Sequence, residues 1–276
     1  MSADRTIAVI GGGLAGAKAA EAARDAGHDG RIVLVGEEPG VPYERPPLSK
    51  DVLRGDKDVS VTHVHPDGFY DDRSIELVRG RVVGLDVEAR RIAVDGAEPI
   101  TFDSAVIATG SEPRRLDIPG SDLDGVHYLR TIEDSERLGT AIRSAGRVAV
   151  VGAGWIGSEV AASARQMGAE VVLIDPTPVP LQRVLGDTIG AVFAALHSEH
   201  GVQLRPGNGV TELRGSGSVE EVVLSDGRVE PADVVVVGVG VTPPGRAGRR
   251  RRAAPRQRDP RRRAPGDQRA GHLRRG

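Results

Sequence analysis

The chain begins its first ordered pattern with Thr6-Ile7-Ala8-Val9-Ile10-Gly11-Gly12-Gly13-Leu14-Ala15-Gly16. An apolar run of the kind that fills a buried strand meets a glycine-rich turn, and an Ala-rich segment then continues to Ala26. A second apolar run, residues 31–35, ends at Gly36-Glu37-Glu38. This order predicts strand, tight turn, helix and strand, which is the βαβ unit of dinucleotide-binding folds.

The same pattern returns about 140 residues later. Residues 147–151 form an apolar run, Gly152-Ala153-Gly154-Trp155-Ile156-Gly157 follows it, and residues 170–175 close the second unit. Between the units, residues 75–108 alternate apolar and polar side chains around a turn at Asp95-Gly96, which predicts a β-meander. The expected fold is therefore α/β, with two Rossmann-like domains, the second inserted into the first.

Each glycine of the two motifs has a separate task. The first permits the tight turn, the second lets the backbone approach a pyrophosphate, and the third lets the helix pack on the strand. The six positions are Gly11, Gly13 and Gly16 in the first motif, and Gly152, Gly154 and Gly157 in the second. Two purely structural turns are the alternative, but both motifs lie between a strand and a helix, which favours two dinucleotide sites.

An acidic residue follows each motif at the distance expected for a ribose contact. Glu37 and Asp175 are placed to accept hydrogen bonds from an adenosine ribose. A carboxylate at Asp175 repels a 2′-phosphate, and the next basic residue is Arg183, so the second site is expected to prefer NAD to NADP. An ordinary polar strand end is the alternative for both residues.

The amino-acid composition excludes several kinds of chemistry. The chain has 276 residues and no cysteine, which excludes a disulfide scaffold, a cysteine-ligated metal and a redox-active thiol. Its formal charge of −2 combines an acidic body with residues 244–276, which hold 13 Arg and 2 Asp. No basic leader or apolar run of spanning length is visible, so a cytoplasmic protein without membrane contact is expected.

The loop Tyr43-Glu44-Arg45-Pro46-Pro47-Leu48-Ser49-Lys50 resembles that of a known family. It is similar to the FAD-dependent NADH:ferredoxin reductases of cytochrome P450 and aromatic-ring oxygenase systems, the putidaredoxin, rhodocoxin and biphenyl dioxygenase reductase type. Further similar segments begin at Ala108, Tyr128, Gly152 and Gly238, and the likeness covers residues 5–243. The resemblance implies an FAD-binding domain in residues 1–111 and an NAD(H)-binding domain in residues 112–243.

The resemblance also implies site residues. On the FAD side it adds Ala15, Arg45, Lys50, Val82 and Arg130 to Glu37 and the glycines. On the NADH side it adds Ile156, Glu159 and Gly240 to Asp175 and the glycines. Lys50 and Glu159 are expected to meet beside the flavin as the catalytic pair, with a surface salt bridge as the alternative. Trp155 is expected either to cover the flavin or simply to pack.

The implied function is transfer of electrons from NADH through FAD to a [2Fe–2S] ferredoxin-type carrier. Relatives that reduce disulfides use a cysteine, which this chain lacks. A catalytically defective nucleotide-binding fragment and a basic-tailed nucleic-acid binder are the alternatives, and the tail's lack of interleaved aromatics disfavours the latter. His63 and His65 could share a metal, but no third ligand is apparent, so both are interpreted as surface histidines.

Residues 244–276 form an Arg- and Pro-rich tail with one large aliphatic side chain, Leu273, and are expected to be disordered. The family resembled here would instead continue with a helix and a strand ending in an Asp that binds FAD. Back-translating residues 271–276 and reading one base later permits a similar segment. A frameshift near residue 244 is therefore hypothesised, and the chain as written is expected to purify without flavin.

Overall fold

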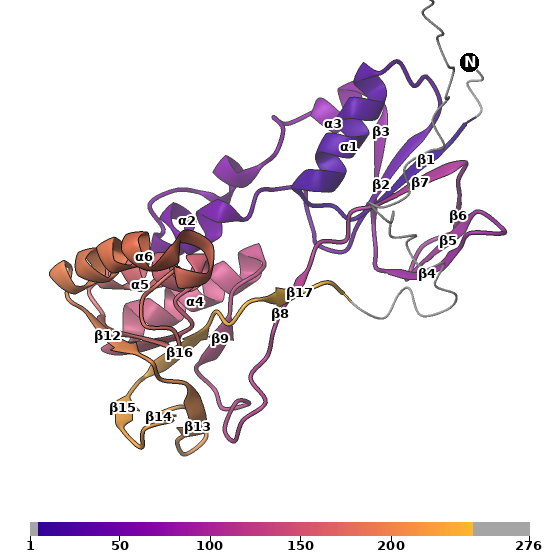
Figure 1. The fold of residues 1–276 in the computed structure, drawn as a ribbon. Coiled ribbons are helices and arrows are strands. Elements are labelled where there is room, and N and C mark those ends of the chain that lie inside the picture. The colour runs from indigo at the N-terminus through magenta and orange to yellow at the C-terminus, as the bar shows by residue number, and fades with distance from the viewer. Residues whose placement is uncertain (1–4, 245–276) are drawn as a thin grey trace, which may run out of the picture.

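The computed structural model describes residues 5–244, so the expectations for the Arg-rich tail concern a segment outside the described residues apart from Pro244. Two parallel sheets, each with its own helices, form two lobes (Figure 1). The fold is α/β with two units of the same design, as the sequence predicted. None of the helices within residues 5–244 is long and apolar enough to cross a bilayer.

The first unit contains a four-stranded parallel sheet in the order β3-β2-β1-β7. Its strands are β1 Ile7–Ile10, β2 Ile32–Gly36, β3 Ile75–Arg79 and β7 Ser104–Ile107, and its helices are α1 Leu14–Asp25 and α3 Phe69–Asp72. The apolar strands β1 and β2 lie in the middle of the sheet and are buried, as continuous apolar runs predict. Helix α1 ends before Gly27, whose φ of +82° continues the chain in a left-handed turn.

The predicted meander is shorter than residues 75–108. Only β4 Val82–Asp86, β5 Arg91–Val94 and β6 Ile100–Thr101 pair antiparallel, with the turn at Asp95-Gly96 between the last two. The flanking strands β3 and β7 belong to the parallel sheet instead. Strand β3 was misassigned because a half-exposed edge strand alternates like a strand of a meander. Strand β7 does not alternate; it was assigned to the meander because it follows β6 directly in the sequence.

The second unit contains a five-stranded parallel sheet in the order β12-β11-β10-β16-β9. Its strands are β9 Val126–Tyr128, β10 Arg147–Val151, β11 Glu170–Asp175, β12 Val202–Pro206 and β16 Val234–Val237. Its helices are α4 Ile132–Ser144, α5 Trp155–Gln166 and α6 Gln182–Glu199, and a small antiparallel sheet consists of β13 Val210–Arg214, β14 Glu221–Leu224 and β15 Val229–Pro231. Helix α4 starts with a complete capping box between Thr131 and Asp134.

The chain passes between the units on two neighbouring segments. Strand β8, Glu112–Pro113, leads into the second unit and pairs antiparallel with β17, Val241–Thr242, which leads out of it. This pairing lies at the junction of the two lobes (Figure 1). The exact domain boundaries remain a prediction.

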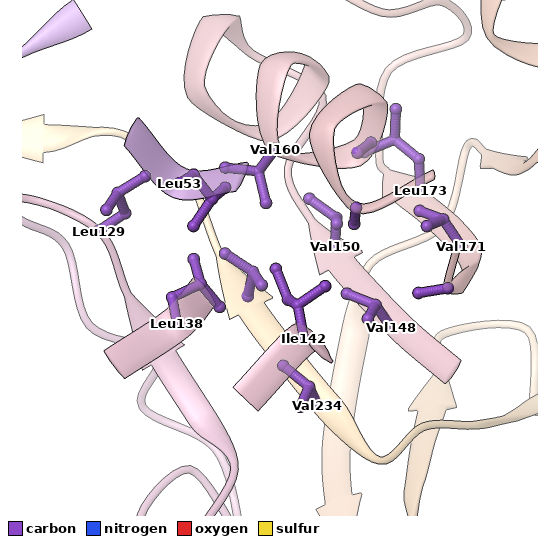
Figure 2. Packing of buried hydrophobic residues seen from close by; sticks show 14 of the residues in the cluster. Leu53, Leu129, Leu138, Ile142, Val148, Val150, Val160, Val171, Leu173 and Val234 are labelled. Carbon is purple, nitrogen blue, oxygen red and sulfur yellow. The ribbon is translucent and has the colours of Figure 1, made fainter. Parts of the chain in front are cut away.

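The proline loop, residues 43–62, belongs to the first third of the chain but packs on the second unit. It folds as the short helices η1 Pro46–Ser49, α2 Asp51–Arg54 and η2 Val59–Thr62. Leu48 and Leu53 are 2% and 1% exposed and share one apolar cluster with Leu138, Val150 and Val160 of the second unit. Figure 2 shows Leu53 among these side chains. The core of the second unit therefore holds the loop, although the loop lies within the first unit in sequence.

Candidate functional site

The two glycine loops have the same stereochemistry. Gly11 and Gly152 adopt φ angles of +121° and +102°, which favour glycine. A Cβ on Gly11 would lie 2.2 Å from the carbonyl oxygen of Ala108, and one on Gly152 would lie 2.5 Å from that of Gly238. The first glycine of each motif is thus required by both its backbone angle and its neighbour across the sheet.

The third glycine of each motif lies against the first. A Cβ on Gly16 would lie 1.9 Å from the carbonyl oxygen of Gly11, and one on Gly157 would lie 1.8 Å from that of Gly152. Each helix therefore packs onto its strand more closely than any side chain allows, as the motif predicts.

The second glycine of each motif faces open space. A Cβ on Gly13 or Gly154 would meet no atom within 4 Å. Both residues are N-caps without a side-chain hydrogen bond, so the first-turn amides of α1 and α5 have no side-chain cap. Ala15 and Ile156 occupy corresponding places in the two first turns. An open, uncapped helix N-terminus behind a glycine turn fits the pyrophosphate of a dinucleotide.

The two acidic residues have different surroundings. One oxygen of Asp175 accepts from the backbone N–H of Ala153 at 2.6 Å, and the other accepts from the N–H and hydroxyl of Thr177 at 2.7 and 2.6 Å. Asp175 therefore ties the glycine loop to the end of β11. Glu37 is exposed and, within residues 5–244, makes no hydrogen bond or ion pair. The ribose contacts of both remain predictions.

A difference in register explains this contrast. The amide of Gly11 donates to Val35, and that of Gly152 donates to Ile174. Gly36 therefore occupies the place in β2 that Asp175 occupies in β11, and Glu37 lies one residue further along. Glu37 follows Gly16 by 21 positions and Asp175 follows Gly157 by 18, and both distances fit the loose spacing of about 20 that the motif allows, so the sequence did not reveal the shift.

Lys50 and Glu159 meet, as the resemblance implied. The Nζ atom of Lys50 lies 2.7 Å from Oε2 of Glu159 and donates to the carbonyl oxygen of Pro46 at 2.9 Å. Ser49 donates its hydroxyl to the same Glu159 oxygen at 2.5 Å. The lysine lies in the proline loop, between η1 and α2, and the glutamate lies on α5, so the pair joins the two parts of the chain.

Arg45 lies in a network that the sequence did not reveal. Its guanidinium donates to Glu38 at 2.6 Å, to the hydroxyl of Tyr43 at 3.0 Å and to the carbonyl oxygen of Arg130. Tyr43 in turn donates to Glu38, and burial together with this bond raises the pKa of Tyr43. The only signal in the sequence was Glu38, a second acidic residue next to Glu37. The dinucleotide motif requires a single acidic residue at this place, so the second one had no role assigned to it.

The Arg130 guanidinium lies beside Gly110 and has no acidic partner among the described residues. Burial, and then the charge of Arg45, lower the pKa of Arg130. A half-buried cation next to another cation is suited to an anionic ligand such as a phosphate.

The remaining predicted residues are spread around the two loops. Val82 begins β4 and packs against a cluster that also contains Ala8 and Ile10 of β1, the strand that leads into Gly11. Gly240 follows β16 with a φ of +101° and open space around its Cα. Since β16 and β10 are parallel neighbours, Gly240 lies at the edge of the sheet that carries Gly152. Trp155 starts α5 and is 48% exposed.

The interpretation of His65 as a surface histidine was wrong. Its side chain is 5% exposed, and its ring stacks on Phe69 at 3.7 Å with an interplanar angle of 7°. His63 is 28% exposed. No group of three metal-ligating side chains occurs in the described part of the chain. The burial of His65 arises because α3 brings Phe69 and Tyr70 back over it, which no local pattern indicated.

We expect His65 to make stability pH-dependent. Burial lowers the pKa of His65, so below the unfolded-state value of about 6.5 the unfolded chain binds the proton more readily. Its contribution to the free energy of unfolding therefore falls as the pH drops through that value. His65→Phe should flatten the difference between urea unfolding at pH 7.5 and at pH 5.5. His63→Phe is the control, and equal pH slopes for wild type and His65→Phe would contradict the prediction.

Comparison with known proteins agrees with this geometry. The family model described as "Pyridine nucleotide-disulphide oxidoreductase" matches residues 5–259. Rhodocoxin reductase of Rhodococcus erythropolis is 42% identical over 240 residues, which is 86% of this chain and 56% of that protein. The ferredoxin–NAD(+) reductase component of the biphenyl dioxygenase system of Paraburkholderia xenovorans (strain LB400) is 38% identical over 86% of this chain and 58% of its own length.

Solved structures give the same result. The ferredoxin reductase for the CYP199A2 system from Rhodopseudomonas palustris superimposes with a TM-score of 0.85 at 39% identity, over 88% of this chain and 61% of that one. Putidaredoxin reductase, in its covalent complex with putidaredoxin, gives a TM-score of 0.83 at 32% identity, over 87% and 59% of the two chains. The chain thus spans less than two thirds of the length of these relatives. Its two glycine loops, its sheet topology and the extent of the match show that it belongs to the pyridine nucleotide-disulphide oxidoreductase family.

Proposed function

We propose that this chain belongs to a flavoprotein reductase that passes electrons from NADH through FAD to a [2Fe–2S] ferredoxin-type carrier. The observation that carries the proposal is the 2.7 Å ion pair between Lys50 and Glu159. It brings together a residue from the first βαβ half of the chain and one from the helix behind the second glycine loop. The names of two relatives support the acceptor: one is a ferredoxin–NAD(+) reductase component of a dioxygenase system, and the other is a ferredoxin reductase for the CYP199A2 system.

The residues on each side fit the two cofactors chemically. An open glycine, an uncapped helix N-terminus and the unpaired Arg130 favour a diphosphate on the first side. We assign FAD to Gly11, Gly13, Ala15, Gly16, Glu37, Arg45, Lys50, Val82 and Arg130. We assign NADH to Gly152, Gly154, Ile156, Gly157, Glu159, Asp175 and Gly240. The corresponding domains are residues 1–111 and 112–243.

The bound cofactors would supply the redox chemistry, and the protein would bind and orient them. When bound, FAD accepts a hydride from NADH and releases its electrons singly. Lys50 supplies a positive charge and Glu159 a negative charge where the two halves of the chain meet, while the loops orient the two dinucleotides. Asp175 holds the second loop in shape and opposes a 2′-phosphate, which favours NADH. A cytoplasmic location remains part of the proposal.

One observation favours the second candidate, a nucleotide-binding fragment that holds flavin weakly. Strand β7 lies at the edge of the first sheet and is exposed along its length, with Val106 and Ile107 at 38% and 66%. A parallel strand with exposed apolar side chains is unusual, since both faces of parallel sheets are normally covered. We therefore expect the 276-residue chain to purify without bound FAD and still to bind NADH.

NADH binding and reductase activity are measured separately. Trp155 is the only tryptophan and starts the helix behind the second glycine loop, so its fluorescence reports occupancy of that site. We expect NADH to bind about tenfold more tightly than NADPH, a difference of about 1.4 kcal/mol. With FAD added in excess, we expect NADH-dependent reduction of a [2Fe–2S] ferredoxin. Binding without reduction would favour the fragment, and no preference for NADH would contradict the role of Asp175.

Lys50→Met is the matching test of the ion pair, and Lys57→Met is its control. Lys57 lies on the same segment but pairs with Asp51, away from Glu159. We expect Lys50→Met to slow flavin reduction about tenfold, equivalent to about 1.4 kcal/mol in the barrier. Equal rates for the two variants would remove the ion pair from the mechanism.

A further inference from the structure

The proline loop contains two carbonyl groups that its own backbone leaves without partners. Helix η1 ends at Ser49 and α2 starts at Asp51, and Lys50 between them has φ −126° and ψ −114°, which breaks the helical path. No backbone N–H of the described residues outside η1 donates to the carbonyl oxygen of Leu48 or Ser49. Buried carbonyls at a helix end need a partner from elsewhere.

Two buried serines of the second unit supply those partners. The hydroxyl of Ser135 on α4 donates to the carbonyl oxygen of Leu48 at 2.8 Å. The hydroxyl of Ser163 on α5 donates to that of Ser49 at 2.7 Å. The serines are 1% and 2% exposed, so neither bond competes with water. Each hydroxyl replaces a helical hydrogen bond that the break at Lys50 removes.

These two bonds lie directly before the ion pair. Ser49, 4% exposed, donates its own hydroxyl to Glu159, so its carbonyl and side chain are both held by α5. Glu159 and Ser163 are one turn apart on that helix. The backbone that carries Lys50 therefore has fixed positions at Leu48 and Ser49, and Lys50 has little freedom to move relative to Glu159.

We propose that Ser135 and Ser163 are positioning residues that hold Lys50 against Glu159 and so align the two dinucleotide sites. Their effect on electron transfer rests on the proposed function, whereas their effect on Lys50 does not. Removing either hydroxyl leaves a buried carbonyl without a partner, and the loop relieves this by moving away from α5. Lys50 then separates from Glu159 while the rest of the second unit keeps its core.

Competitive acetylation tests the effect on Lys50 directly. The chain has three lysines, Lys18, Lys50 and Lys57, so one mass-spectrometric experiment reports the reactivity of all of them. In Ser163→Ala and in Ser135→Ala we expect the rate of acetylation of Lys50 to rise about fivefold. The loss of one hydrogen bond changes an equilibrium by about this factor, and the movement of the loop makes the amine of Lys50 accessible to the reagent. Lys18 and Lys57 pair with Glu21 and Asp51 and should not change.

Ser158→Ala is the matched control. Ser158 is also buried on α5, but its hydroxyl donates to the carbonyl oxygen of Ala153 in the glycine loop before the helix, at 3.4 Å, and makes no bond to the proline loop. Ser158→Ala should leave the acetylation of Lys50 at the wild-type level. Ser163→Thr keeps the hydroxyl, so it should also give the wild-type level rather than the raised level of Ser163→Ala. A parallel rise at Lys57 would mean that the whole loop unfolds, and an unchanged Lys50 would mean that the serines do not position it. Either result overturns the proposal.

The catalytic arm separates this inference from the proposed function. With FAD added, Ser163→Ala should lower kcat about fivefold and leave the affinity for NADH, read from Trp155, unchanged. If wild type shows no NADH-dependent reduction but Lys50 responds as expected, the proposed function fails and the positioning role stands. If wild type is active and Lys50 does not respond, the positioning role fails alone.

Discussion

We expect Gly157→Ala to unfold the second unit, whereas Gly154→Ala leaves it folded but unable to bind NADH tightly. The two glycines are three residues apart at the start of α5. A methyl group on Gly157 would lie 1.8 Å from the carbonyl oxygen of Gly152, so helix and strand must separate. A methyl group on Gly154 meets nothing within 4 Å, but it enters the space where a pyrophosphate approaches the helix N-terminus.

Two measurements distinguish these outcomes. Circular dichroism and urea unfolding should show loss of the cooperative transition in Gly157→Ala and a nearly unchanged transition in Gly154→Ala. Quenching of Trp155 by NADH should weaken about tenfold or more in Gly154→Ala, an effect of about 1.4 kcal/mol. Gly209→Ala serves as a control for altering a glycine of the same unit, since its Cβ would meet no atom within 4 Å and its φ lies outside the left-handed region. Normal NADH affinity in Gly154→Ala would exclude this loop as the binding site.

We expect Leu53→Ala to lower the free energy of unfolding by about 3 kcal/mol. Leu53 is 1% exposed and lies in the cluster with Leu138, Ile142 and Val160 (Figure 2). The carbonyl of the same residue approaches α4 at Gly139, where an added Cβ would lie 2.6 Å away. Loop and helix are in such close contact that neighbouring side chains cannot fill the space that the leucine leaves.

Val61→Ala is the control for this change. Val61 follows on the same loop and is 52% exposed, so its truncation should alter stability by less than about 0.5 kcal/mol. Urea unfolding of both variants gives the comparison. A small effect for Leu53→Ala would mean that the loop is not part of the second core, and it would remove the structural basis for placing Lys50.

Local patterns predicted the parts of the site that depend on neighbours in sequence. The glycine loops, the helices α1 and α5 that follow them, and the turn at Asp95-Gly96 all follow from short stretches of sequence. The edge strand β3 did not, because alternation is the same in a meander and at the edge of a parallel sheet, and β7 did not, because its return to the parallel sheet directly after β6 depends on strand pairing. The meeting of Lys50 and Glu159 was expected from a family resemblance and could not be derived from spacing.

The sequence by itself determined two βαβ units, the packing roles of the first and third glycine of each motif and the absence of cysteine, since each depends on residue type and local backbone geometry. Only the tertiary structure decided that the proline loop packs on the second unit, that Asp175 is tied to its own loop and that His65 is buried. It also decided that Ser135 and Ser163 hold the loop beside Glu159. The contacts of Ser135 and Ser163 with the loop join residues 87 and 114 positions apart, and they form because buried carbonyls without a helical partner need partners from elsewhere in the chain.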